Sequence, residues 1–143
     1  MRTAKGGLLI PLALLVFAAV ACNFSASTAN ISDLKLGKDK ALTQPTSSFA
    51  ATDTIYAVAT VSNAPGAVKV KGRLAIEDVE GEQSGPIPGL ETTVEVPGSG
   101  TATFNFTPPP SSGWPKGKYK LEVFMLNDAG EQKDQKSASF TVN

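Results

Sequence analysis

The feature that most constrains the fold is an alternation of apolar and charged residues over 68–76. Successive side chains of an extended strand point to opposite faces, so the apolar members share one face and the charged members share the other. The apolar members are Val68, Val70, Leu74 and Ile76, and the charged members are Lys69, Lys71 and Arg73. This pattern predicts a half-buried antiparallel strand with one face on the core and the other in solvent.

Further segments predict strands of the same kind. The alternation recurs over 90–96, 101–107, 118–125 and 137–142, while 54–61 is apolar almost throughout and 31–37 is a weaker first strand. Residues rich in Gly, Pro, Asn and Asp separate these segments at 63–66, 80–86, 97–100 and 127–130. About seven short strands with such turns predict an all-β, two-sheet sandwich over residues 31–143, in one domain.

The first residues predict export from the cytoplasm. Arg2 and Lys5 precede a run of apolar residues from Leu8 to Val20, broken only by Pro11. A bilayer core needs about 20 apolar residues, so the run is too short to span it. Positive residues, a short apolar run and then small residues are the order of a secretory signal peptide, which we expect over residues 1–21.

Three ways of processing this segment remain open, at two cleavage positions. Ala19-Val20-Ala21 suits ordinary signal peptidase, which would release a soluble protein, and a second small-residue stretch ends at Ala29. Ala19-Val20-Ala21 followed by Cys22 also resembles the lipobox of bacterial lipoproteins, although Leu is commonest at the position of Ala19. That resemblance implies a diacylglycerol, with palmitate-like chains, on Cys22 as the mature N-terminus.

Cysteine usage favours the lipid. Cys22 is the lone cysteine of the chain, so it has no partner for a disulfide. Two acyl chains would hold the protein on a membrane, and residues 22–30 are small and polar enough to form a flexible tether. The expected location is the cell envelope: the outer membrane if the organism is Gram-negative, and otherwise the outer face of the cytoplasmic membrane.

Residues 112–123 resemble the start of strand F of an immunoglobulin-like domain, and residues 137–142 resemble its last strand. Tyr119 stands where the tyrosine corner would be, two residues before the position of the second cysteine. Leu121 occupies that position, and Leu74 or a neighbour replaces the core tryptophan of strand C. The resemblance implies an immunoglobulin-like sandwich and implies nothing about function.

Composition excludes several classes of chemistry. The chain has no histidine, which excludes a histidine base, a Ser-His-Asp triad and histidine metal ligands. Without Arg2 and Lys5, 11 basic residues face 13 acidic ones, a net charge of −2, so nothing indicates nucleic acid. With Cys22 lipidated, thiol catalysis is excluded too. We expect no catalytic residues and no cofactor.

Three groups of residues are candidates for contact or metal sites. Strands C and F are neighbours in an immunoglobulin-like sheet, so Lys69, Lys71, Arg73, Lys118 and Lys120 would share one basic face, relieved only by Glu122. Trp114, in the proline-rich segment 107–115, would either cap the core or stand out as a contact for sugar or peptide. The acidic turn with Glu77, Asp78, Glu80 and Glu82 matches no calcium motif, so we expect no metal site.

The function expected from these features is contact at a membrane surface. The anchor would concentrate a non-enzymatic binding module, whose partner would be a protein or an anionic envelope polymer. Two alternatives stay open: a small carbohydrate-active or other cell-envelope enzyme, and a protease inhibitor that uses the stiff loop 108–115. The enzyme would require two carboxylates that converge in a pocket.

Overall fold

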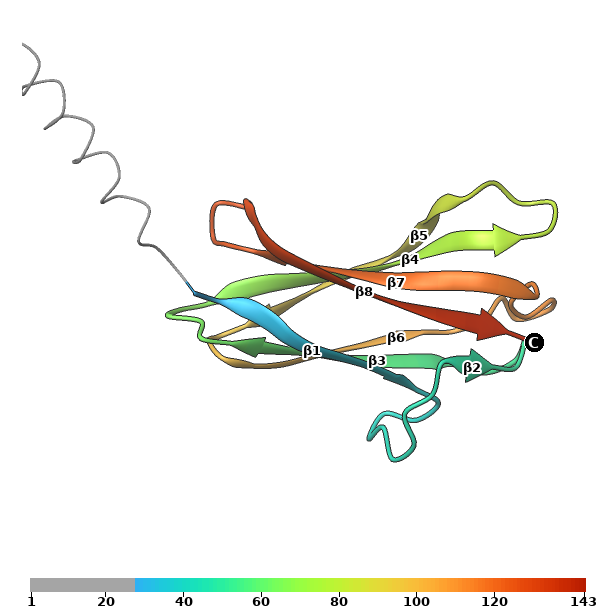
Figure 1. Ribbon diagram of the computed structural model, residues 1–143, viewed down its shortest axis with the longest axis horizontal. Helices are drawn as coiled ribbons and strands as arrows, with labels where there is room; N and C mark the ends of the chain where they lie inside the picture. The colour runs from blue at the N-terminus through green and yellow to red at the C-terminus, as the bar shows by residue number, and fades with distance from the viewer. Residues whose placement is uncertain (1–27) are drawn as a thin grey trace, which may run out of the picture.

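The computed structural model describes residues 28–143, in which eight strands and no helix are present (Figure 1). The predicted signal peptide and Cys22 lie outside the described residues. The strands are β1 (Asn30–Gly37), β2 (Ser48–Phe49), β3 (Ile55–Ser62), β4 (Val68–Val79), β5 (Gly85–Val96), β6 (Gly100–Phe106), β7 (Gly117–Leu126) and β8 (Gln132–Val142). No helix long and apolar enough to cross a membrane occurs in this part of the chain.

The strands form two sheets packed face to face. One sheet has the order β1-β3-β6 and the other has the order β2-β8-β7-β4-β5 (Figure 1). The expected all-β sandwich is therefore confirmed, as is the pairing of β4 with β7. The expectation of about seven antiparallel strands missed β2, which pairs in parallel with β8. Two residues are too short to show any periodicity.

Three strands are longer than their sequence patterns predicted. β4 continues to Val79, β5 begins at Gly85 and β8 begins at Gln132. The added residues are mostly polar and exposed, so no apolar alternation marks them. Backbone pairing with a neighbouring strand extends these strands, and the order of apolar and polar side chains does not reveal such pairing.

The apolar members of each alternation fill the space between the sheets. Leu74 and Leu121 are fully buried and lie opposite each other in the β4–β7 pairing. Leu121 stands at the position where the immunoglobulin-like pattern expects the second cysteine, and Leu74 packs beside it in the core. Gly72 lies where the two sheets approach closely, because a Cβ there would stand 3.0 Å from Cδ1 of Phe104.

The tyrosine corner is present. Tyr119 is buried, and its hydroxyl donates a hydrogen bond of 2.7 Å to the backbone oxygen of Pro115. Its ring stacks on Phe140 with centroids 5.4 Å apart. Gly117 precedes it with a φ of 147°, and a Cβ there would stand 2.5 Å from the backbone oxygen of Asp78. The corner thus fixes how β7 enters the sheet.

Candidate functional site

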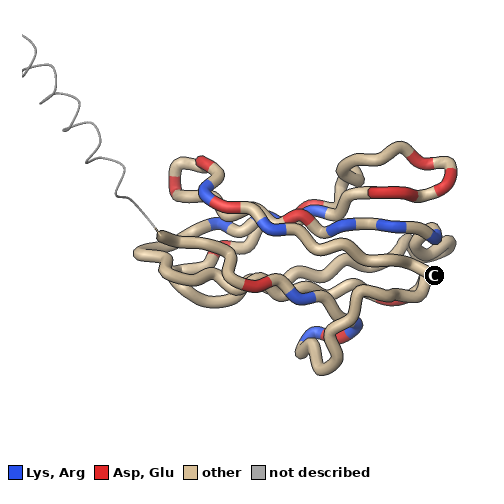
Figure 2. Tube along the Cα trace, viewed as in Figure 1, with Lys and Arg blue, Asp and Glu red and all other residues tan. Residues whose placement is uncertain are grey.

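The structure brings the five predicted cations onto one face. Lys69, Lys71 and Arg73 alternate along β4, and Lys118 and Lys120 alternate along the adjacent β7. Arg73 lies opposite Glu122, and residues directly opposite each other in a ladder share a face of the sheet, so the cations of both strands lie on the face away from the core. Figure 2 shows these positive residues along the five-stranded sheet, with acidic residues among them.

The expectation that Glu122 alone relieves this charge is wrong. β5 lies on the other side of β4 and contributes Glu91 and Glu95, the latter directly opposite Lys69. Nζ of Lys71 lies 3.4 Å from Oε2 of Glu91. The sequence pattern of β5 shows both glutamates, but it does not show which strand they will face. The face is therefore mixed in charge rather than basic.

Arg73 is the most constrained cation of the face. Its Nε donates a hydrogen bond of 2.9 Å to Oε1 of Glu122, and its guanidinium lies 4.8 Å from the ring centroid of Phe124. Nζ of Lys120 lies 3.8 Å from Oε2 of the same Glu122. Glu122 is only 9 % exposed, so the ion pairs are partly shielded from solvent. Arg73 is held from two sides.

Phe124 is a site residue that sequence reasoning missed. It lies opposite Lys71 in the β4–β7 pairing, on the charged face of β7. The signal was available, because Phe124 follows Lys118, Lys120 and Glu122 in the outward phase of the alternation. An aromatic residue in an outward phase indicates either a stacking partner for a cation or a contact surface.

An open groove of about 440 Å³ lies beside these side chains. Arg73, Lys120 and Glu122 form part of its lining, together with Ala75, Ile76, Glu77, Ser84, Gly85 and Pro86. The groove follows from an irregularity of β5, which pairs Glu91 with Arg73 but Pro86 with Ala75. The residues between, including Gly89 at a φ of 82°, bulge out of the ladder.

Two carboxylates line this groove, and each already has partners. Glu122 uses one oxygen for Arg73 and the other for Lys120. Glu77 accepts a hydrogen bond from the hydroxyl of Ser139, and its backbone oxygen accepts one of 2.9 Å from Ser84. Among residues 28–143, no group of three or more His, Cys, Asp and Glu residues could hold a metal ion. The groove offers charged groups for hydrogen bonding.

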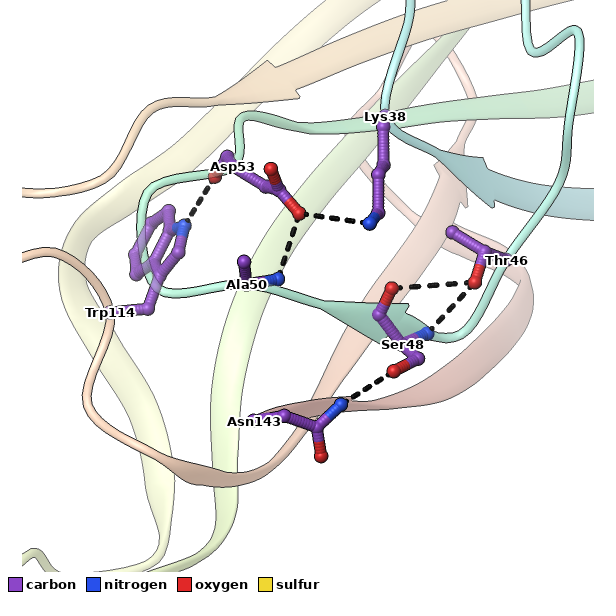
Figure 3. Close-up of polar contacts among 7 residues, drawn as sticks. All are labelled: Lys38, Thr46, Ser48, Ala50, Asp53, Trp114 and Asn143. Carbon is purple, nitrogen blue, oxygen red and sulfur yellow. Dashed lines mark hydrogen bonds and ion pairs between the residues drawn. The ribbon is translucent and has the colours of Figure 1, made fainter.

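Trp114 lies elsewhere and is buried, with 4 % of its surface exposed. Its Nε1 donates a hydrogen bond of 2.8 Å to the backbone oxygen of Asp53 (Figure 3). Its backbone N–H donates one of 2.8 Å to the backbone oxygen of Ala51. The interpretation of Trp114 as a surface contact for sugar or peptide is therefore wrong. The indole caps the core, because both its ring and its N–H find partners there.

The same end of the sandwich carries a polar network. The Asp53 carboxylate accepts a hydrogen bond of 2.7 Å from the backbone N–H of Ala50, and Nζ of Lys38 lies 3.3 Å from the same oxygen (Figure 3). These two contacts, the first being the larger, hold the pKa of Asp53 below its ordinary value despite partial burial. Asn143 donates a hydrogen bond to the hydroxyl of Ser48, which fastens the C-terminus to β2.

The comparison with solved structures found proteins of similar fold, whereas no protein-family model and no curated protein matches the chain. A solved cycloisomaltooligosaccharide glucanotransferase from Paenibacillus sp. is 16% identical with a TM-score of 0.51, but the match covers 81% of this chain and only 14% of that one. A Niemann-Pick type C2 protein from the Japanese carpenter ant is 12% identical over 83% of this chain and 96% of its own, with a TM-score of 0.49. At these identities, the likeness concerns the fold alone.

Proposed function

We propose that this protein is a lipid-anchored, extracytoplasmic binding module that works by surface contact at the groove of the five-stranded sheet. The observation that carries the proposal is the fixed position of Arg73 at the groove, between the Glu122 carboxylate and the Phe124 ring. A side chain already held in place loses little conformational entropy when a partner binds to it. The groove is thus organised for binding before the partner arrives.

The charges on this face restrict which kinds of partner can bind. The cations Lys69, Lys71, Arg73, Lys118 and Lys120 are interleaved with the carboxylates Glu77, Glu91, Glu95 and Glu122. With charges so nearly balanced, attraction over long distances is weak, and short-range complementarity decides which partner binds. The partner we propose is a protein or an envelope polymer that presents anionic groups to Arg73 and Lys120.

The anchor supplies concentration at the membrane. Cys22 would carry the lipid, and residues 23–29 would tether the sandwich, which begins at Asn30. Confinement to a surface raises the effective concentration of the module for a neighbouring partner without any new contact. We place the protein in the outer membrane of a Gram-negative cell, or on the outer face of the cytoplasmic membrane otherwise.

One observation favours a second candidate, a small carbohydrate-active enzyme. Glu77 and Glu122 line the same groove, and pairs of carboxylates hydrolyse glycosidic bonds. Both oxygens of Glu122 are already paired with Arg73 and Lys120, which supports binding instead, because Arg73 uses only its Nε in this pair and keeps its other N–H groups for a partner. The test is the release of reducing sugar from envelope polysaccharide. If the wild-type protein releases sugar and both Glu77→Gln and Glu122→Gln abolish this activity, the protein is an enzyme and the binding proposal is wrong.

The binding proposal is tested by capture from membranes. We compare the wild-type protein with Arg73→Gln and Lys120→Glu, and with Lys40→Glu, an exposed cation of the β1–β2 loop, as control. We expect the two groove variants to recover about tenfold less of the captured partner, because each removes a positive charge from the interface, and the control to match wild type. Equal capture by all four proteins would overturn the proposal for the groove.

A further inference from the structure

The strand edges of the two sheets differ in how they are protected. An exposed edge presents unpaired N–H and C=O groups, and natural sheets blunt such edges with prolines, charges, bulges or covering segments. In residues 28–143 the edge strands are β1 and β6 of one sheet, and β2 and β5 of the other (Figure 1). Three of these edges carry such protection.

β1 is covered at both ends. The backbone N–H of Ile31 donates a hydrogen bond of 2.8 Å to Oδ2 of Asp134 in β8, and the backbone oxygen of Leu36 accepts one of 2.9 Å from Thr46. A register shift also interrupts β1 between Ile31 and Asp33. Its edge is therefore unavailable to another strand.

The edges of the five-stranded sheet are protected by the shortness of β2 and by the prolines and charges of β5. β2 has only two residues. β5 contains Pro86, Pro88, Glu91 and Glu95, so it lacks two backbone donors and carries two like charges. An antiparallel copy of β5 paired about Thr93 would place Glu91 opposite Glu95, which is unfavourable.

β6 has none of these devices. Its seven residues, Gly100 to Phe106, contain no proline and no charge, and pair without a register shift with β3 alone. In the described part of the chain, no turn or loop backbone hydrogen bond reaches these residues. Its side chains at Thr101, Thr103 and Asn105 are exposed. β6 is thus an uncharged edge strand without a bulge, and its outer side is open.

We propose that β6 pairs with β6 of a second copy of this chain, in antiparallel register about Thr103. A two-fold axis through Thr103 places this residue opposite its own copy and brings the same edge of both chains together, so an edge of one charge repels itself and an uncharged edge does not. Thr103 then faces Thr103, and Thr101 faces Asn105 of the other copy. Threonine pairs across strands are favourable, and hydroxyl and amide groups can hydrogen-bond to each other. The two three-stranded sheets become one continuous sheet across the dimer.

The dimer leaves the groove free, because β6 lies in the other sheet. It would also join two anchored chains. This pairing and the proposed function are independent: a dimer can form whether or not the groove binds a partner, and the groove can bind a partner on a monomer.

The register is tested with engineered cysteines in the mature full-length chain, purified from whichever cell fraction holds it, with detergent where that fraction is the membrane. Paired strands bring opposite Cα atoms to about 4.5–5.5 Å, within the range that a disulfide spans. We expect Thr103→Cys to form a covalent dimer under mild oxidation. Thr101→Cys and Asn105→Cys should each stay monomeric alone and cross-link when mixed. The parent chain, with Cys22, gives the background.

Analytical ultracentrifugation of the same full-length protein supplies a second readout. Thr103→Lys places like charges at the two-fold axis and should weaken dimerisation by about tenfold, while Ser137→Lys, on the exposed face of β8, should not. A monomer at all concentrations, or cross-linking without the predicted register, overturns the proposal. Pairing of β6 with an extended segment of another protein, with this chain monomeric, also overturns it.

Discussion

Removal of the Tyr119 hydroxyl tests the tyrosine corner. In Tyr119→Phe the ring still stacks on Phe140, and only the hydrogen bond of 2.7 Å to Pro115 disappears. A net intramolecular hydrogen bond contributes about 0.5–1.5 kcal/mol. Pro115 is exposed, so water can partly replace the missing donor at its carbonyl. We therefore expect a loss of about 1 kcal/mol, or roughly 4 °C in Tm for a domain of this size.

The same substitution changes how stability depends on pH. Burial first, and the nearby charge of Glu82 second, raise the pKa of Tyr119 above its ordinary value of 10.0. The unfolded chain therefore loses this proton at a lower pH than the folded chain does. The stability that this difference in pKa contributes is complete below the pKa of the unfolded chain and is lost as pH rises through the raised pKa of the folded chain. Wild type should lose stability in this alkaline range, and Tyr119→Phe should lose less.

Urea unfolding followed by the fluorescence of Trp114, the lone tryptophan, measures both effects. Tyr56→Phe is the matched control, since it removes the hydroxyl of the other tyrosine, which is only half-buried. We expect Tyr56→Phe to stay within about 0.5 kcal/mol of wild type. If Tyr119→Phe is as stable as the control at neutral pH and shows the same alkaline loss as wild type, the reasoning about the corner is refuted.

Two further changes test the packing of the sandwich and its polar end. Gly72→Ala forces a methyl group to within 3.0 Å of Phe104, so it should cost about 1–3 kcal/mol in urea unfolding, whereas Gly66→Ala, which meets no atom within 4 Å, should not destabilise. Because the pKa of Asp53 is lowered in the folded state, its carboxylate stabilises the fold at any pH above the pKa of the unfolded chain, and this stability is lost as pH falls through the folded pKa. Asp53→Asn should therefore lose less stability on acidification than wild type does. Equal stability of both glycine variants, or the same loss on acidification in Asp53→Asn as in wild type, would contradict these explanations.

The sequence was most informative where side-chain alternation and turn residues agree. Val70, Leu74, Leu121 and Val123 are all buried, as their phase predicts. Burial at alternate positions depends on local chain geometry, which period-two alternation records directly. The role of Tyr119 in the corner was implied instead by the resemblance to an immunoglobulin-like domain.

The site was less predictable, because it depends on which strands become neighbours. Lys71 and Arg73 point outward as expected, but the carboxylate of Glu91 reaches Lys71 through a strand pairing that no local pattern encodes. The bulge of β5 that forms the groove is likewise a property of two strands together. For Trp114 the sequence left open whether the side chain caps the core or stands out, and the tertiary contact with Asp53 decides for the core.

In-cell photo-crosslinking tests most directly the claim that the groove contacts a partner at the membrane. A photoreactive amino acid replaces Ser84, an exposed residue of the groove lining, and in a matched strain it replaces Asp128, an exposed residue of the β7–β8 loop. We predict a discrete adduct from position 84 in the membrane fraction and none from position 128. Absence of an adduct at position 84, or the same adducts from both positions, would contradict the claim.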